Sequence, residues 1–151
     1  RKVFGMVQEA ITRLEDILRD VPPALFEMDE TELSRKPSEN KWSKKEILGH
    51  LIDSATNNHQ RFVRGQFEDT PEIAYDQNNW NTFNFYQEIE AEQIIEFWTS
   101  YNRQLLEIMK RIASERLTNE IRVGENSLTL AFLVVDYVEH LEHHLKQIVN
   151  Y

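Results

Sequence analysis

The sequence predicts an all-α protein, a four-helix bundle with one long crossover connection. Four long stretches carry apolar residues at helical spacing, which is typical of amphipathic helices. Only four Gly and four Pro interrupt the 151 residues. One connector exceeds about 15 residues, a length typical of a crossover or a lid. Helix bundles can include such a crossover, and a chain of this length is expected to form a single domain over residues 1–151.

The first helix is predicted near the start of the chain. Apolar residues recur at helical spacing from Val3 to Leu18, and Pro22 with Pro23 is expected to end the helix. Residues 24–40 carry several Asp and Glu and are expected to form a solvated connector without chemistry of its own.

The second helix has clear signals at both ends. Ser43 followed by Glu46 matches a capping box, in which each side chain satisfies a free N–H at a helix start. The predicted helix covers residues 43–64 and ends at Gly65. The long connector follows over residues 66–89 and is rich in aromatic residues.

Two further helices complete the predicted bundle. The third covers residues 90–114 and the fourth covers residues 127–149, both with apolar residues at helical spacing. Between them, residues 118–126 contain Gly124, and Ile121 lies in a short piece that can be extended.

Composition excludes several classes of protein. The net charge of −9 argues against nucleic-acid binding, which depends on Lys and Arg that neutralise phosphates. The absence of Cys excludes disulfides, a thiolate zinc site and a cysteine nucleophile. The longest apolar run, residues 128–135, is well short of the roughly 20 residues that span a bilayer. With no signal segment visible, we expect a cytoplasmic protein that binds neither nucleic acid nor membrane.

The five His residues fall in two short windows, 50–59 and 140–144. His140 and His144 are four residues apart, so they lie about 40° apart on one helix face and can meet at one point. His50 lies beside the apolar face of the second helix. Three imidazoles from two facing helices predict a site for a divalent metal with open positions. Hydrogen-bonded structural histidines are the alternative, which we prefer for His59 and His143.

Other residues near these faces have weaker signals. Asp53 and Asp136 each lie about one turn from a predicted ligand, so they can orient its ring or act as a general base. A solvated carboxylate is the alternative for both, with Asp53 lying further toward solvent than His50. Asn57 can contact a ligand or make an ordinary helix-packing hydrogen bond. Tyr75 and Trp80 can cover the open metal position as part of a substrate lid, or simply pack the crossover.

Two segments resemble a known family. The stretch WSKKEILGHLIDS at residues 42–54 and the stretch HLEHHLKQI at residues 140–148 are similar to the DinB-like superfamily of metal-binding four-helix bundles. Its pattern has Trp-Ser or Trp-Thr at the start of the second helix and a ligand His about two turns later. Its closing pattern is His, three residues, a second His, then Gln-Ile. The aromatic crossover is also similar, and the resemblance covers nearly the whole chain.

The resemblance implies a DinB-like bundle with nickel or zinc on His50, His140 and His144. Characterised relatives include S-transferases that use bacillithiol, mycothiol or glutathione, and thiol-dependent maleylpyruvate isomerases. Other relatives are described as metal-dependent hydrolases, and family members are often dimers.

We therefore expect a metal-dependent enzyme acting on a small molecule, with a homodimer as the expected assembly. The leading prediction is transfer of a low-molecular-weight thiol, activated by the metal, onto a small electrophile. Hydrolysis by a hydroxide bound to the metal is the alternative. A non-catalytic, ligand-binding helical bundle is the second alternative.

Overall fold

The computed structural model describes residues 2–151. Within this range, four long helices form a bundle, which confirms the predicted all-α class, and short elements connect them. In chain order the elements are α1 (Lys2–Phe26), α2 (Glu30–Ser34), α3 (Lys44–Arg64), α4 (Gln77–Phe83), a 3-10 turn (Tyr86–Glu88), α5 (Ala91–Arg111), a 3-10 turn (Ser114–Arg116), β1 (Glu120–Val123), β2 (Asn126–Thr129) and α6 (Leu130–Leu145).

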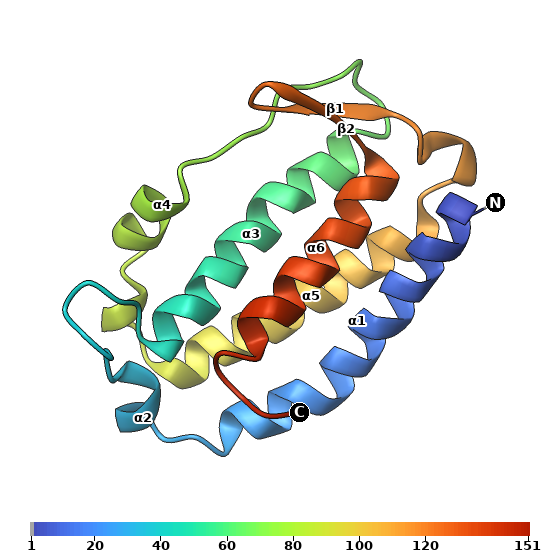
Figure 1. The fold of residues 1–151 in the computed structure, drawn as a ribbon. Helices are drawn as coiled ribbons and strands as arrows, with labels where there is room; N and C mark the ends of the chain where they lie inside the picture. Colours follow the sequence, from blue (N-terminus) through green and yellow to red (C-terminus); the bar gives the residue numbers. More distant parts are fainter. Residues whose placement is uncertain (1) are drawn as a thin grey trace.

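The bundle contains neighbouring helices that run in the same direction. Figure 1 shows α3 and α5 running one way and α1 and α6 running the other. Helix α3 packs against α5 and α6, and α1 packs against the same two helices. Because the neighbours α3 and α5 are parallel, the chain must return along the length of the bundle between them. The connector between Arg64 and Ala91 makes this return and contains α4.

The prediction that two prolines end the first helix is wrong. Pro22 and Pro23 lie inside α1, which continues to Phe26. Proline has no N–H to donate, so the helix loses hydrogen bonds at this point. Val21 and Leu25 on either side are fully buried in the core. The gain from burying these apolar side chains outweighs the local disruption.

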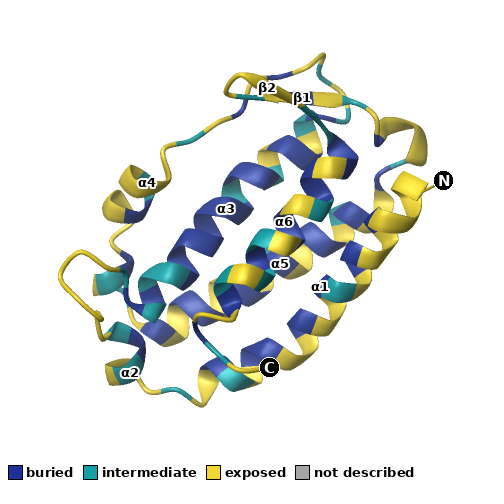
Figure 2. Ribbon diagram, in the orientation of Figure 1, coloured by how far each residue is buried: buried dark blue, intermediate teal, exposed yellow. Residues whose placement is uncertain are grey.

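The predicted boundaries of the second helix are confirmed. The Ser43 hydroxyl accepts a hydrogen bond from the Glu46 N–H at 3.1 Å, and the Glu46 carboxylate accepts one from the Ser43 N–H at 3.0 Å. Gly65 follows the last turn of α3. Figure 2 shows that α3 is buried along most of its length, since α5, α6 and the crossover surround it.

The acidic connector is more structured than predicted. Asp29 caps the short helix α2, where its carboxylate accepts a hydrogen bond from the Glu32 N–H at 2.8 Å. Glu30 forms an ion pair with the buried Lys45 at 2.8 Å. The segment therefore packs against α3 instead of being only solvated.

The fourth helix begins three residues later than predicted and ends at Leu145, and the third ends at Arg111. Residues 127–129 belong to β2 and pair antiparallel with β1, with Ile121 opposite Leu128. The crossover joins this hairpin through a hydrogen bond of 2.9 Å from the Ile73 N–H to the Arg122 carbonyl. This pairing depends on distant residues, so helical periodicity alone extends the predicted helix too far.

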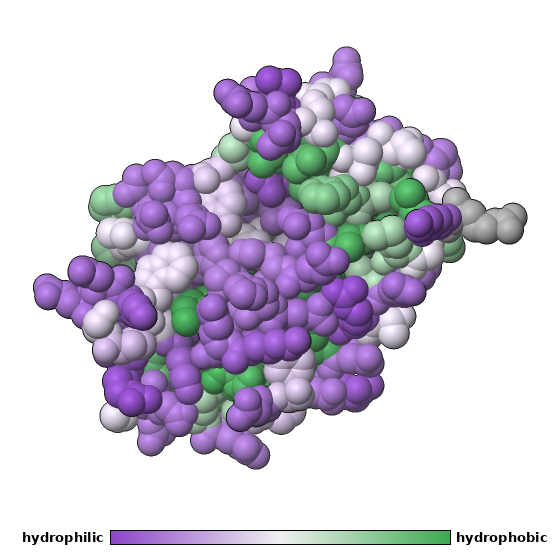
Figure 3. All heavy atoms as spheres, viewed as in Figure 1, coloured by the Kyte–Doolittle hydropathy of each residue, from purple (hydrophilic) through white to green (hydrophobic). Residues whose placement is uncertain are grey.

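The surface is mainly hydrophilic on the face shown in Figure 3, with apolar side chains gathered near the start of α1. Val3, Phe4 and Met6 are each about half exposed there, as is Phe132 on α6. None of the described helices is long and apolar enough to cross a bilayer.

Candidate metal centre

Three histidines converge between α3 and α6. His50 comes from α3, while His140 and His144 come from successive turns of α6. One ring nitrogen from each side chain lies within 4.8 Å of the other two. The Nε2 atoms of His50 and His140 are 3.3 Å apart. The structure thus brings together the three side chains that the sequence selects.

The protein environment keeps the rings of His50 and His140 neutral. His50 is only 1% exposed, and burial, with His140 and His144 nearby, lowers the pKa of its imidazole to about 4. Burial and the neighbouring His144 and His143 lower the pKa of His140 to about 4 as well. Neutral imidazole is the form that binds a metal, so both rings are available at pH 7.

The contacts around the rings fit a bound divalent ion. His144 Nδ1 lies 3.0 Å from the Gln147 amide oxygen, so Nδ1 carries the proton and Nε2 remains free as a ligand. The ring of Trp42 packs against His50 with centroids 5.1 Å apart. His50 Nδ1 is buried without a partner among the described residues. Three imidazole nitrogens suit zinc or nickel and leave coordination positions for a substrate.

Asp53 is buried, which corrects the expectation that it lies toward solvent. Its side chain is 1% exposed, and its Oδ1 accepts hydrogen bonds from the Tyr86 hydroxyl at 2.6 Å and the Asn84 amide at 2.9 Å. Its Oδ2 has no partner among the described residues. Burial raises the pKa of Asp53 to about 6 despite these two hydrogen bonds. Helical spacing cannot predict the burial of Asp53, because Tyr86 and Asn84, which cover it, come from the crossover.

The backbone of α3 near Asp53 packs closely against the crossover. A Cβ atom on Gly49 would lie 2.2 Å from the Tyr86 ring, so the ring packs directly on the α3 backbone beside His50. Phe85, between the two residues that donate to Asp53, has a left-handed backbone with φ of 57°. Such strain persists only where surrounding contacts hold it in place. Here those contacts include both hydrogen bonds to one carboxylate oxygen.

The other predicted site residues have varied positions. Asn57 is buried, and its amide donates to the Asp53 carbonyl at 2.9 Å, an ordinary contact within a helix. Tyr75 and Trp80 are half-buried in the crossover, with ring centroids 5.8 Å apart. Asp136 is exposed on α6, one turn before His140.

The remaining two histidines lie outside the cluster. His143 is exposed on α6. His59 is half-buried, and its Nδ1 lies 2.9 Å from the Tyr101 hydroxyl. His59 is therefore hydrogen-bonded as expected, whereas His143 lies at the surface.

The sequence analysis assigns no role to Tyr86, Asn84 or Arg61. The first two act through long-range contacts that no local pattern reveals. Arg61 shares the helix face of His50 and Asn57, so its spacing was an available signal.

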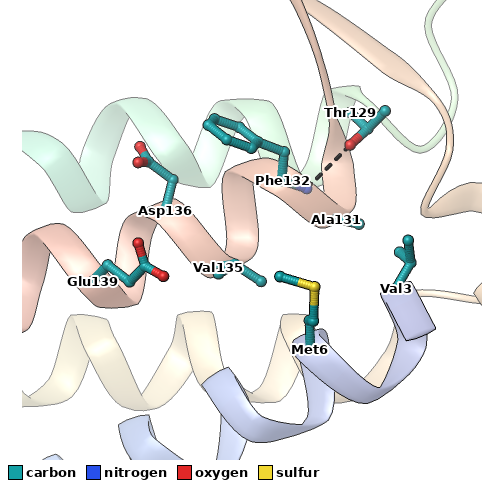
Figure 4. Close-up of a pocket in the computed structure, with 8 residues that line it drawn as sticks. All are labelled: Val3, Met6, Thr129, Ala131, Phe132, Val135, Asp136 and Glu139. Atoms are coloured by element: carbon teal, nitrogen blue, oxygen red, sulfur yellow. Dashed lines mark hydrogen bonds between the residues drawn. The ribbon is translucent and has the colours of Figure 1, made fainter.

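A pocket of about 310 Å³ opens between the start of α1 and α6. Figure 4 shows Met6 of α1 facing Val135 of α6 across this pocket, while the Asp136 carboxylate points toward α3. The three clustered histidines do not line this pocket, which is mainly apolar.

Comparisons with known proteins agree with this geometry. The model of the DinB superfamily matches residues 10–148. "Putative metal-dependent hydrolase YfiT" of Bacillus subtilis is 27% identical over 146 residues, covering 91% of this chain and 79% of YfiT. A protein of Oceanobacillus iheyensis with the same descriptive name is 22% identical over 144 residues, covering 94% of this chain and 83% of that protein.

Solved structures show the same fold. The structure of YfiT, described as having an unusual four-helix bundle topology, matches with a TM-score of 0.84 at 20% identity, over 94% of this chain and 83% of YfiT. The crystal structure of the mycothiol-dependent maleylpyruvate isomerase matches with a TM-score of 0.77 at 9% identity. That match covers 94% of this chain and 60% of the isomerase.

Proposed function

The chain belongs to the DinB superfamily, and from that premise we propose that it is a metal-dependent enzyme whose divalent ion is held by His50, His140 and His144. The observation that carries this proposal is the approach of three ring nitrogens from two helices to within 4.8 Å of one another. Zinc or nickel is the ion that this donor set favours.

The ion and the protein have separate roles. When bound, a divalent ion lowers the pKa of a thiol or water, which supplies a nucleophile near neutral pH. Burial keeps His50 and His140 neutral, and Gln147 holds Nδ1 of His144 so that Nε2 is free to bind the ion. Tyr75 and Trp80 from the crossover are the proposed substrate contacts, whereas the Asn57 amide donates to the Asp53 carbonyl of its own helix.

Asp53 is the proposed proton acceptor. Its pKa of about 6 is close to neutral pH, where a general base is most effective. Tyr86 and Asn84 occupy Oδ1, so Oδ2 is free to take the proton that the nucleophile loses. Asp136 is the second candidate, but its exposed position gives it no comparable hydrogen-bonded support.

We propose transfer of a low-molecular-weight thiol onto a small electrophile as the reaction. The fold shared with a mycothiol-dependent isomerase supports this choice, and the absence of Cys means that the thiol must come from outside the chain. Hydrolysis is the second candidate, because the relatives from Oceanobacillus iheyensis and Bacillus subtilis are named as putative metal-dependent hydrolases.

The two reactions are separated by assaying untagged protein reloaded with zinc or nickel. The electrophile 1-chloro-2,4-dinitrobenzene is tested with cysteine or bacillithiol, and p-nitrophenyl acetate is tested without thiol. We expect thiol-dependent conversion that falls on the order of a hundredfold in His140→Ala. His143→Ala is the matched control, because His143 is exposed on the same helix, and it should retain activity.

The alternatives predict other results. Ester hydrolysis that is indifferent to thiol would replace the transferase assignment with hydrolysis. Metal-loaded protein that is inactive in both assays would favour a non-catalytic binding bundle.

A further inference from the structure

Arg61 is a buried cation on α3 with only neutral partners. It is 7% exposed, and its Nε and Nη2 donate to the Ile73 carbonyl at 3.1 and 2.9 Å. Its Nη1 donates to the Asn58 amide oxygen at 3.3 Å. Among the described residues no carboxylate forms an ion pair with it. A guanidinium has five N–H donors, so two remain after these three contacts.

The other buried cation of the described chain is treated differently. Lys45 is 4% exposed, and its Nζ lies 2.8 Å from a Glu30 carboxylate oxygen. Burying a charge is unfavourable unless it is paired. The fold therefore pairs one buried cation and leaves the other without an anion, which indicates that the anion for Arg61 comes from outside the chain.

Arg61 lies in the same seam as the histidine cluster. It shares its α3 face with His50 and Asn57, and α6 runs antiparallel along this face (Figure 1). On α6, Asp136 precedes His140 by one turn, and its carboxylate points toward α3 (Figure 4). Asp136 acts to raise the pKa of Arg61 from a distance, but burial outweighs it and no ion pair forms.

The crossover reaches Arg61 close to Tyr75. The Ile73 carbonyl, which accepts two hydrogen bonds from Arg61, lies two residues before Tyr75. Burial raises the pKa of the Tyr75 hydroxyl, the charge of Asp53 adds to the rise, and the Arg61 cation opposes it.

We propose that Arg61 binds a carboxylate of the substrate, which makes the substrate a small carboxylic acid whose reacting carbon lies toward the histidines. This inference rests on the proposed function for its reacting end. Arginine suits the role because its planar fork matches a carboxylate.

The helix spacing sets the length of the substrate. Arg61 lies eleven positions after His50, which is about 16 Å along a helix at 1.5 Å per residue. The bond to Asn58 brings the guanidinium back by nearly one turn toward the histidines. The carboxylate and the reacting carbon would thus be on the order of 10 Å apart.

The direct test is calorimetric binding of linear dicarboxylates to the zinc-loaded protein. Succinate, glutarate, adipate and suberate are compared with monocarboxylates of equal length. One carboxylate can occupy the metal while the other reaches Arg61. We expect the dicarboxylate of one chain length to bind at least about tenfold more tightly than the monocarboxylate of that length. An affinity difference of this size is reasonable for one charge-assisted hydrogen-bonded pair.

Two variants test whether the tighter binding of dicarboxylates depends on Arg61 itself or on any positive charge of α3. Arg61→Met should reduce that advantage to within about twofold. Arg64→Met is the matched control, since Arg64 lies on the same helix but is already paired with Glu68 at 2.7 Å, and it should keep the full advantage. A folded Arg61→Met protein that retains the advantage would overturn the proposal. So would equal binding of dicarboxylates and monocarboxylates by the wild type.

A second set of measurements keeps the proposal testable if the Arg61→Met protein does not fold or if the wild type does not bind zinc. Arg61→Lys keeps the charge but not the fork, and it should lose most of the advantage while still folding. In metal-free wild type, acetate should shift the Arg61 Nε–H signal in nitrogen–proton NMR and saturate. If the protein does not bind zinc but acetate still gives a saturable shift of the Arg61 signal, the proposed function is wrong and the carboxylate site is supported. Absence of a saturable shift would remove the carboxylate site even if zinc binds.

Discussion

His50 and Asp53 lie within one turn of each other on α3, and burial moves their pKa values in opposite directions. Burial and the two neighbouring histidines lower the pKa of His50 to about 4, and burial raises the pKa of Asp53 to about 6. Both shifts favour the uncharged side chain. At pH 7 the imidazole is therefore ready to bind a metal, and the carboxyl group titrates just below neutrality.

These shifts predict that acid destabilises the metal-free protein. His50 and His140 have ordinary values of 6.5 and folded pKa values of about 4. Between these values the unfolded chain binds more protons, so stability present above pH 6.5 is lost as the pH falls toward 4. At about 1.4 kcal/mol per pKa unit, the upper bound is roughly 3.5 kcal/mol for each histidine.

The pKa shift of Asp53 changes stability in the opposite direction and should reduce this loss. Its pKa rises from 3.8 to about 6 on folding, so the folded state binds more protons in that interval and gains stability on acidification. Asp53→Asn should therefore lose stability more steeply than wild type between pH 7 and pH 5. Urea unfolding in the presence of EDTA measures both slopes. Equal slopes, or a wild type that gains stability in acid, would contradict these pKa assignments.

At the scale of elements, α3 depends on the crossover as much as on its neighbouring helices. The Tyr86 ring lies on the backbone of Gly49, and the Tyr86 hydroxyl holds Asp53 one turn later. A short segment of the crossover thus fixes the carboxylate that we propose as the base. This contact requires glycine at position 49 because no side chain fits there.

Gly49→Ala should consequently destabilise the protein by about 1–3 kcal/mol, the usual cost of overpacking. The displaced Tyr86 would also release Asp53, so activity should fall more than stability explains. Gly5→Ala is the matched control. Position 5 lies in α1 with open space around it, so the change should stabilise by about 0.5–1 kcal/mol. Urea unfolding of both variants checks this, and a harmless Gly49→Ala would contradict the packing of Tyr86.

The elements differ in how far the sequence could predict them. The start of α3 is fixed by contacts within three residues, Ser43 with Glu46, and was predicted closely. The continuation of α1 through Pro22 depends on core packing with other helices, and the start of α6 depends on β2 pairing with β1. Such long-range contacts leave no local periodicity, so these boundaries were missed.

At the scale of the whole molecule, topology creates the site. The antiparallel approach of α3 and α6 brings His50 to the pair on α6, and the crossover supplies Tyr75, Tyr86 and Asn84 along the same helix. Helical geometry could select the three inward-facing histidines, because each face follows from its own helix. It could not assign Asp53 its partners or show that Arg61 forms no ion pair with a carboxylate of residues 2–151, since both depend on how distant segments meet.

The most direct test of the whole account is a calorimetric titration of untagged, EDTA-stripped protein with zinc or nickel. We expect one ion per chain and a melting temperature that rises with metal, because binding to the native state alone stabilises it. His50→Ala combined with His144→Ala should abolish both effects, whereas His143→Ala should keep them. A double variant that binds metal as well as wild type does would contradict the three-histidine site.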